Sequence, residues 1–283
     1  MGNQNYFGDI KDKVCVVTGG AGVIGTTIAV ELANLGAKVV ILDYKQDRCD
    51  ACATHISDKT GVTVKCVVSN VMDKEALLAT KKEINDELGP IDVLINAAGG
   101  NSPEATTKDD WITPENVENW DDNFFGLNIK GFHDVFNLNF IGTLLPTMVF
   151  AKDMVNRGGC VLNVSSMNAF RPLTRIPAYS SGKASINNFT EWLAVHLAKV
   201  NVRVNAIAPG FLLTNQNRFL LIDEKTNELT ARGKKILDST PMGRFGEPEE
   251  MVGTVLFLIS NVSQFITGTV IPIDGGFNAY SGV

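Results

Sequence analysis

The 283-residue sequence predicts an α/β protein whose single domain, residues 1–283, contains one doubly wound sheet of about seven parallel strands with helices on both faces. Short β-branched apolar runs alternate with stretches of helical periodicity along the chain. The runs are nearly continuous in hydrophobicity, as is typical of parallel strands that are covered on both faces. No repeat, low-complexity tract or linker divides the sequence.

The predicted elements follow in order along the chain. Strands are expected at 13–19, 37–43, 63–69, 92–99, 159–166, 202–210 and 269–276. Helices are expected at 26–36, 73–88, 144–158, 179–200 and 248–260. Gly36, Gly89 and Gly158 stand where helices are expected to end, as C-terminal cap residues do.

Two longer segments, about 100–138 and 211–245, interrupt this alternation. Long irregular segments within a compact domain are often lids or binding loops. Both follow predicted strands, and ligands of an open α/β sheet bind beyond the carboxyl ends of the strands. We therefore expect both insertions on the substrate side of the sheet.

Composition and charge narrow the classes of partner. A net charge of −6 argues against a nucleic acid or an anionic membrane as partner, because both favour a basic face. We expect no membrane span, since no apolar run approaches the length of a bilayer crossing. The segment 1–13 lacks the apolar core of a signal peptide, so a cytoplasmic protein is expected.

The five cysteines are expected to be free thiols in a reducing compartment. Cys49, Cys52 and His55 have a spacing that could supply part of a zinc site, but no second ligand pair accompanies them. We therefore predict no metal site and place these three residues on a surface helix.

A glycine-rich stretch, TGGAGVIG at 18–25, joins the first predicted strand to the first predicted helix. The pattern of Gly20, Gly22 and Gly25 lets the backbone approach a pyrophosphate at the helix N-terminus. Asp43 ends the second predicted strand, where a carboxylate accepts hydrogen bonds from ribose hydroxyls. Together they predict a dinucleotide site on a Rossmann-type sheet.

The sequence resembles the short-chain dehydrogenase/reductase family over most of its length. The resemblance rests on TGGAGVIG, NAAG at 96–99, Ser166 thirteen residues before Tyr179, YSSGK at 179–183, PGFLLT at 209–214 and the C-terminal run from GRFGEPEE to ITGTVIPIDGGF. It implies a nicotinamide-dependent oxidoreductase, commonly a homotetramer. The catalytic residues that it implies are Asn139, Ser166, Tyr179 and Lys183. The cofactor-binding residues that it implies are Gly19, Gly20, Gly22, Val23, Ile24, Gly25, Asp43, Asn70, Val71, Asn96, Ala97, Gly99, Tyr179, Lys183, Pro209, Gly210, Leu212 and Thr214.

The chemistry of Tyr179 and Lys183 can also be argued from their spacing, because residues i and i+4 share one helix face. Lowering a tyrosine pKa from about 10 to about 7 requires roughly 4 kcal/mol. One ammonium at about 4 Å contributes roughly that amount at an effective dielectric of 20. We therefore expect Tyr179 to exchange a proton with the substrate oxygen, which Ser166 would hydrogen-bond. By resemblance, Lys183 also holds the nicotinamide ribose, and Asn139 supports a water relay to Lys183.

The sequence departs from the family pattern at two places. The middle glycine of the family motif falls where Val23 stands, so Gly22 is displaced by one residue. After the third strand the family often has Asp-Val, whereas this protein has Asn70 followed by Val71. We expect the turn to keep its pyrophosphate role and Asn70 to contact the edge of the adenine.

NAD is expected as the cofactor in preference to NADP. Asp43 would repel a 2′-phosphate, and Tyr44 stands where phosphate-binding members tend to place arginine. Lys45 and Arg48 weaken this argument, because either could pair with the phosphate.

The expected substrate loops are polar and carry Asn101, Ser102, Arg171, Arg175 and residues 215–218, which read NQNR. The residues chosen to bind substrate are Asn101, Ser166, Arg171 and Tyr179, since arginine can bind a carboxylate bidentately. The strings NAAGGNSPEATT, FRPLTRIPAYSSGKA and GFLLTNQNRFLL resemble the D-mannonate oxidoreductases (fructuronate reductases) of the same family. This resemblance implies a sugar acid, with a gluconate-type or other polyol dehydrogenase as the alternative.

A non-catalytic, dinucleotide-sensing regulator on the same fold is the alternative of another class. Such a protein would be expected to lose the tyrosine or the lysine, and both are present here.

Overall fold

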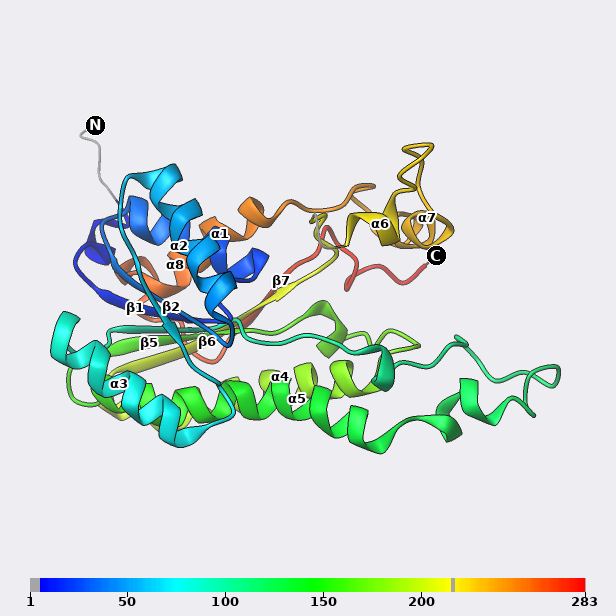
Figure 1. Cartoon of the computed structure of the whole chain (residues 1–283), viewed down its shortest axis with the longest axis horizontal. Coiled ribbons are helices and arrows are strands. Elements are labelled where there is room, and N and C mark those ends of the chain that lie inside the picture. Colours follow the sequence, from blue (N-terminus) through cyan, green and yellow to red (C-terminus); the bar gives the residue numbers. More distant parts are fainter. Residues whose placement is uncertain (1–5, 215–216, 283) are drawn as a thin grey trace.

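The computed structural model describes residues 6–214 and 217–282, and in it helical layers cover both faces of one sheet (Figure 1). All six strand pairings are parallel, and the strand order is β3-β2-β1-β4-β5-β6-β7. The strands are β1 (Val14–Thr18), β2 (Lys38–Asp43), β3 (Lys65–Val68), β4 (Val93–Asn96), β5 (Gly159–Val164), β6 (Val202–Pro209) and β7 (Val270–Ile273). The predicted parallel sheet is confirmed.

Helices α1, α2 and α8 cover one face of this sheet, and α3, α4 and α5 cover the other (Figure 1). The α-helices are α1 (Val23–Asn34), α2 (Gln46–Thr60), α3 (Lys74–Leu88), α4 (Ile129–Phe150), α5 (Pro177–Leu197), α6 (Arg218–Leu221), α7 (Ala231–Asp238) and α8 (Val252–Ile259). Alternate side chains of β1 enter opposite cores, Cys15 and Val17 on one face and Val14 and Val16 on the other. This two-sided burial explains the continuous apolar runs.

The prediction of a helix at 144–158 was wrong at its start. Helix α4 begins at Ile129, where the Asn128 side chain accepts a hydrogen bond from the Gly131 amide at 3.0 Å. Its first turns expose Lys130, His133 and Asp134 to solvent, and this polar face obscured the apolar periodicity. The first insertion therefore covers about 100–128 rather than 100–138, and its helical parts are short 3-10 turns.

The expectation that no apolar run is long enough to cross a membrane also needs correction. Within the described residues, the helical stretch Ile129–Met154 is long enough for a membrane span and contains an 18-residue window with a mean hydropathy of 1.2, and half of that window is buried inside the protein. Val149, Phe150 and Met154 belong to the core beneath the sheet. It is accordingly the core helix of this fold.

The cysteines of α2 lie deeper than the sequence suggested. Cys49 and Cys52 are buried, whereas His55 is exposed, so placing all three on a surface was wrong for the two cysteines. Cys52 packs in the core with Ile56, its neighbour one turn along the helix. All five cysteines are free.

The parallel strands present their carboxyl ends along one edge of the sheet, and both insertions extend beyond that edge (Figure 1). An ion pair joins them, because Lys235 of α7 lies 2.8 Å from Asp110 of the first insertion. The space between these loops and the strand ends is where the site forms.

Candidate active site

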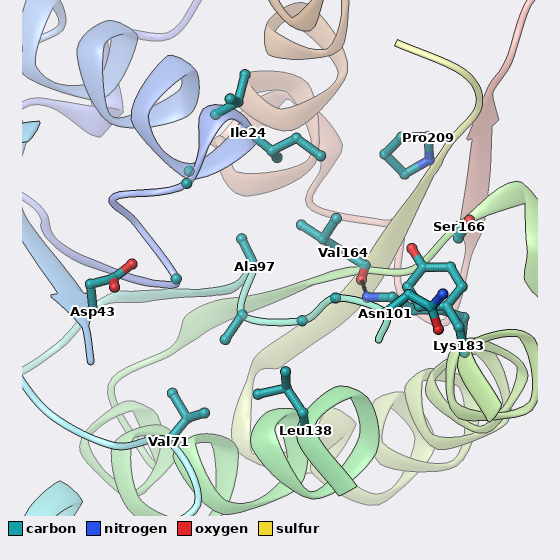
Figure 2. Close-up of a pocket in the computed structure, with 18 of the residues that line it drawn as sticks. Ile24, Asp43, Val71, Ala97, Asn101, Leu138, Val164, Ser166, Lys183 and Pro209 are labelled. Atoms are coloured by element: carbon teal, nitrogen blue, oxygen red, sulfur yellow. Dashed lines mark hydrogen bonds between the residues drawn. The ribbon is translucent and has the colours of Figure 1, made fainter. Parts of the chain in front are cut away.

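A cavity of about 920 Å³ follows the carboxyl edge of the sheet and is lined by residues from the ends of six strands. Figure 2 shows Asp43 at one end and Ser166 and Lys183 at the other, with Ala97 and Val164 between them. An elongated cleft at this edge suits a long ligand whose two ends contact different sets of residues.

The glycine-rich segment leaves no room for a side chain at Gly19, directly after β1, or at Gly25, in the first turn of α1. Gly19 has a φ of +60°, and a β-carbon there would lie 2.6 Å from the Ala98 Cα. A β-carbon on Gly25 would lie 2.6 Å from the Gly20 Cα. Helix α1 therefore begins directly at the cavity, with Gly22 as its N-cap and no side chain of the described residues capping the first amides. Free amides at a helix N-terminus favour an anion such as a pyrophosphate.

The motif's displaced glycine does not disturb this arrangement. Gly22 has extended backbone, with φ at −81°, and Val23 is the first residue of α1. Both line the cavity.

The end of β2 carries a buried carboxylate. Asp43 is 4% exposed, and its Oδ1 accepts a hydrogen bond from the Tyr44 amide at 2.9 Å. Its Oδ2 lies 3.5 Å from Arg48 Nη2. The side chain is thus fixed at the cavity wall, where its carboxylate can accept hydrogen bonds from ribose hydroxyls.

Residues after β3 complete this end of the cavity. Asn70 Oδ1 accepts from the Met72 amide at 3.0 Å, which forms the turn leading to Val71. The Ser69 hydroxyl lines the cavity and is buried without a hydrogen-bond partner in the described part of the chain. An unpartnered buried hydroxyl in a cavity wall is available to a ligand. Ser69 was not among the predicted site residues, although it directly precedes the predicted Asn70.

The opposite end of the cavity brings together Ser166, Tyr179 and Lys183. Lys183 Nζ donates a hydrogen bond to the Val164 carbonyl at 2.7 Å and lies 5.7 Å from the centre of the Tyr179 ring. Ser166 comes shortly after the end of β5, and Tyr179 and Lys183 lie on one face of α5, which begins at Pro177. Three of the four predicted catalytic residues therefore converge at one end of the cavity.

The electrostatic expectation for Tyr179 was wrong for the protein alone. Burial raises the pKa of its phenol, and the hydrogen bond with Ser166 offsets that only in part. Burial also lowers the pKa of Lys183 to about 8. The expected shift required a charged ammonium beside the phenol, whereas here desolvation disfavours the charged form of both groups. Tyr179 is thus a protonated phenol at neutral pH.

Asn139 lies one layer behind the cavity wall and is fully buried. Its Nδ2 donates to the carbonyls of Gly100 at 2.7 Å and Val135 at 2.8 Å, and its Oδ1 accepts from the Gly100 amide at 3.2 Å. A β-carbon on Gly99 would lie 2.6 Å from that Oδ1 and 3.2 Å from Lys183 Nζ. In the structure, Asn139 fixes the loop after β4 beside Lys183.

Two residues predicted to bind the cofactor, Asn96 and Gly20, likewise lie behind the cavity wall and do not line the cavity. Asn96 is buried and donates to Thr147 Oγ1 and Asn163 Oδ1, both at 2.9 Å. A β-carbon on Gly20 would lie 2.9 Å from the Ile41 side chain. Neither residue is among those that line the cavity.

Of the residues predicted to contact the substrate, some line the cavity and others do not. Asn101 lines the cavity, and its Nδ2 donates to Thr106 Oγ1 at 3.0 Å. Arg171 does not line it; the side chain is exposed, and its Nε donates to the Asn278 carbonyl at 2.8 Å. Arg175 Nε donates to the Thr107 carbonyl at 2.8 Å. Asn215 and Gln216 lie outside the described residues.

The remaining residues of the predicted catalytic and cofactor-binding sets all line the cavity. The cavity is also lined by residues that were not predicted, and most of them are adjacent in sequence to a predicted residue. This adjacency is the signal that could have identified them. These residues are Leu42, Tyr44, Arg48, Ser69, Met72, Ala98, Gly100, Leu138, Val164, Ser165 and Phe211, while Asn217, from the expected substrate loop, lines the cavity as well.

The chain is similar to known proteins over nearly its whole length. Residues 19–278 match a family model described as Enoyl-(Acyl carrier protein) reductase. An uncharacterized oxidoreductase from Haemophilus influenzae is 48% identical over 277 residues, which are 97% of this chain and 96% of the relative.

Solved structures show the same fold. A proposed D-mannonate oxidoreductase from Haemophilus influenza, with bound NAD, has a TM-score of 0.92 and 47% identity, covering 99% of this chain and 100% of that one. A gluconate 5-dehydrogenase from Burkholderia cenocepacia, in complex with NADP and tartrate, has a TM-score of 0.79 and 25% identity, covering 97% of this chain and 99% of that one.

Proposed function

The chain is an oxidoreductase of the short-chain dehydrogenase/reductase family, and from this premise we propose that it interconverts D-fructuronate and D-mannonate with NAD(H). The observation that carries the proposal is the placement of Ser166, Tyr179 and Lys183 at one end of a cavity whose other end holds Asp43.

The residues present fit a dinucleotide at every part of the cleft. The uncapped N-terminus of α1 suits the pyrophosphate, Asp43 suits the ribose hydroxyls, and the unpartnered Ser69 hydroxyl is available to the adenosine. Lys183 would hold the second ribose. When bound, the nicotinamide would supply or accept the hydride.

The catalytic residues of the protein would transfer a proton to or from the substrate oxygen. Because burial keeps the Tyr179 phenol protonated at neutral pH, it is suited to donate its proton to the oxygen of a ketone during reduction. Ser166 would hydrogen-bond the same oxygen and orient it toward the phenol. In the oxidation direction the phenol must first lose its proton, so that direction is favoured at higher pH.

A sugar acid as substrate is supported by the polar surroundings of the catalytic end and by the relatives. The solved structure with the higher similarity bears a D-mannonate oxidoreductase name, and the other is a gluconate 5-dehydrogenase with a dicarboxylate bound. Asn101 lies at the cavity, and Arg171 projects from the segment between Ser166 and Tyr179 with both Nη groups free of hydrogen bonds to described residues. We propose that Arg171 receives the substrate carboxylate.

The test is a substrate panel followed by nicotinamide absorbance, with D-fructuronate, 5-ketogluconate, 2-keto-sugar acids and uncharged ketoses, each with NADH and NADPH. The proposal predicts the highest kcat/KM for D-fructuronate with NADH. A higher value for 5-ketogluconate would establish the gluconate-type alternative. Tight NADH binding without turnover of any compound would favour a dinucleotide-sensing regulator.

We also propose that the protein is a cytoplasmic homotetramer. Trp192 and Val195 on α5, and Phe265 before β7, each expose more than half of a large apolar side chain, which favours burial by further copies. Sedimentation velocity should give about four times the 30.6 kDa chain mass, and a monomer would refute the assembly.

A further inference from the structure

Asp110, in the first insertion, is bonded to two other segments beyond the carboxyl edge of the sheet. Its Oδ2 lies 2.8 Å from Lys235 Nζ of α7, and its Oδ1 accepts a hydrogen bond from Thr174 Oγ1 at 3.2 Å. Thr174 belongs to the segment that leads from β5 to α5. The hydrogen bond from Lys235, more than the one from Thr174, holds the pKa of the Asp110 carboxyl below its usual range. A single carboxylate thus joins three segments that are distant in sequence.

The first insertion is bonded to the segment before α5 at a second point. The Thr107 amide donates to the Arg175 carbonyl at 3.0 Å, and Arg175 Nε donates to the Thr107 carbonyl at 2.8 Å. Tyr179 follows four residues after Arg175, in the first turn of α5. At the start of the insertion, Asn101 lines the cavity and donates to Thr106 Oγ1 at 3.0 Å. The insertion therefore links the wall at Asn101 to the helix that carries Tyr179.

Helix α7 is connected to another part of the cavity wall through α6. Thr230, the N-cap of α7, donates from its amide to the Leu221 carbonyl at 3.0 Å and from its hydroxyl to the Leu220 carbonyl at 2.8 Å. Helix α6 begins directly after Asn217, which lines the cavity and whose Oδ1 accepts a hydrogen bond from the Thr214 amide at 2.9 Å. A displacement of α7 would therefore move residues of the cavity wall.

The bonds of Asp110 concern the catalytic end of the cavity rather than the adenosine end. Figure 2 shows Asn101 at the same end as Lys183, with Asp43 at the other. The Asp43 carboxylate is fixed by the amide of the next residue and by a side chain of α2. The loss of Asp110 should therefore disturb the substrate end and spare most of the cofactor contacts.

We infer that Asp110 is a positioning residue for the substrate, because its bonds hold the wall segments of Asn101, Tyr179 and Asn217 in one arrangement. Asp110 is not among the described residues that line the cavity, so it acts through these neighbours and not by direct contact. A wall that is arranged before the substrate arrives need not be ordered by binding. Without Asp110 this ordering cost weakens substrate binding and leaves the reaction of the bound complex little changed. The inference rests on the proposed function and adds a determinant of its substrate affinity.

Lys235 and Lys234 form a matched pair for testing this role, because both are exposed residues of α7. Lys235 Nζ contacts Asp110 and also lies 5.7 Å from the centre of the Trp111 ring. Lys234 has no side-chain hydrogen bond or ion pair to any residue that the structure describes. Lys234→Met therefore removes one positive charge from the same helix and leaves the Asp110 contact intact.

The experiment uses the full-length protein and the compound of the substrate panel that the wild type turns over with NADH at the highest kcat/KM. KM and kcat are measured at saturating NADH, and Kd for NADH is measured by fluorescence titration without substrate. The variants are Asp110→Ala, Lys235→Met, the control Lys234→Met, Asp110→Lys, and the exchange Asp110→Lys/Lys235→Asp. Circular dichroism and thermal unfolding confirm that each variant is folded.

Lys235→Met should raise KM about two- to fivefold, the range for a partly exposed ion pair. Asp110→Ala should raise KM about five- to twentyfold, since it also loses the hydrogen bond from Thr174. In both variants kcat and Kd for NADH should change by less than about threefold, and Lys234→Met should leave all three constants nearly unchanged. Asp110→Lys opposes Lys235 with a like charge and should raise KM at least as far as Asp110→Ala. The exchange should lower KM again by about threefold or more, because it restores an ion pair and the Thr174 hydroxyl can accept as well as donate.

Four results would each overturn the inference. They are equal rises of KM in Lys235→Met and Lys234→Met, an unchanged KM in Asp110→Ala, a loss of kcat or of NADH binding as large as the rise in KM, and an exchange variant no better than Asp110→Lys. If Asp110→Ala does not fold, the comparison of Lys235→Met with Lys234→Met decides between the outcomes. None of these results touches the proposed function, because wild-type turnover is retained. A wild type that turns over no compound of the panel would instead refute the proposed function, and the inference with it.

Discussion

Gly99→Ala is expected to damage the site although alanine fits the local backbone. The new β-carbon would lie 2.6 Å from Asn139 Oδ1, where ordinary contacts begin at 3.4 Å, so the two must separate by about 0.8 Å. Asn139 is fully buried and holds three hydrogen bonds to backbone groups of Gly100 and Val135. The same β-carbon would lie 3.2 Å from Lys183 Nζ, which is itself bound to a backbone carbonyl.

The magnitude follows from the bonds at risk. Losing two or three hydrogen bonds at about 1 kcal/mol each should lower the free energy of unfolding by about 2–3 kcal/mol. Displacement of Lys183 should also reduce kcat/KM at least tenfold, since site residues must hold their positions closely. Urea unfolding and steady-state turnover measure the two effects.

Gly100→Ala is the matched control, because a β-carbon at Gly100 meets no atom of the described residues within 4 Å although the residue also lines the cavity. It should stay within about 0.5 kcal/mol of the wild type in stability. Equal behaviour of the two variants in both assays would refute the argument from Asn139 and Lys183.

Two further predictions concern charge. Lys183 has a pKa of about 8 in the folded protein and about 10.4 in the unfolded chain, so the unfolded state binds more protons between these two pH values and the free energy of unfolding should rise with pH there. Urea unfolding should show this rise in the wild type but not in Lys183→Met. Parallel pH dependences of the two proteins would contradict the prediction. Arg171→Ala should lower kcat/KM for D-fructuronate about ten- to a hundredfold, with a much smaller loss for an uncharged ketose, whereas equal losses would make the arginine structural.

The sheet was predictable because its determinants are local. Each strand is a short and mostly apolar run, and the order of strand and helix requires no knowledge of distant contacts. The start of α4 at Ile129 was not predictable in this way, since Lys130, His133 and Asp134 face solvent and conceal the helical period.

The site was predictable where a residue type and its spacing define the chemistry, as for Ser166, Tyr179 and Lys183. Sequence could not distinguish a residue in the cavity wall from one behind it, because Asn139 and Asn96 differ from Asn101 only in three-dimensional position. It also could not predict the pKa of Tyr179, because the balance depends on how deeply the tyrosine and its lysine are buried. It likewise could not predict that Arg48, and not Lys45, lies beside Asp43, because this depends on which side chain turns toward that carboxylate.

The central claim is that the Tyr179 phenol transfers the proton in a nicotinamide-dependent reaction. The direct measurement is kcat for D-fructuronate reduction by wild type and Tyr179→Phe, together with Kd for NADH in both proteins. A proton donor in the transition state typically contributes a rate factor of about 10²–10⁴, so kcat should fall at least a hundredfold while Kd for NADH stays within about threefold. A variant that retains a tenth or more of the wild-type kcat would contradict the assignment.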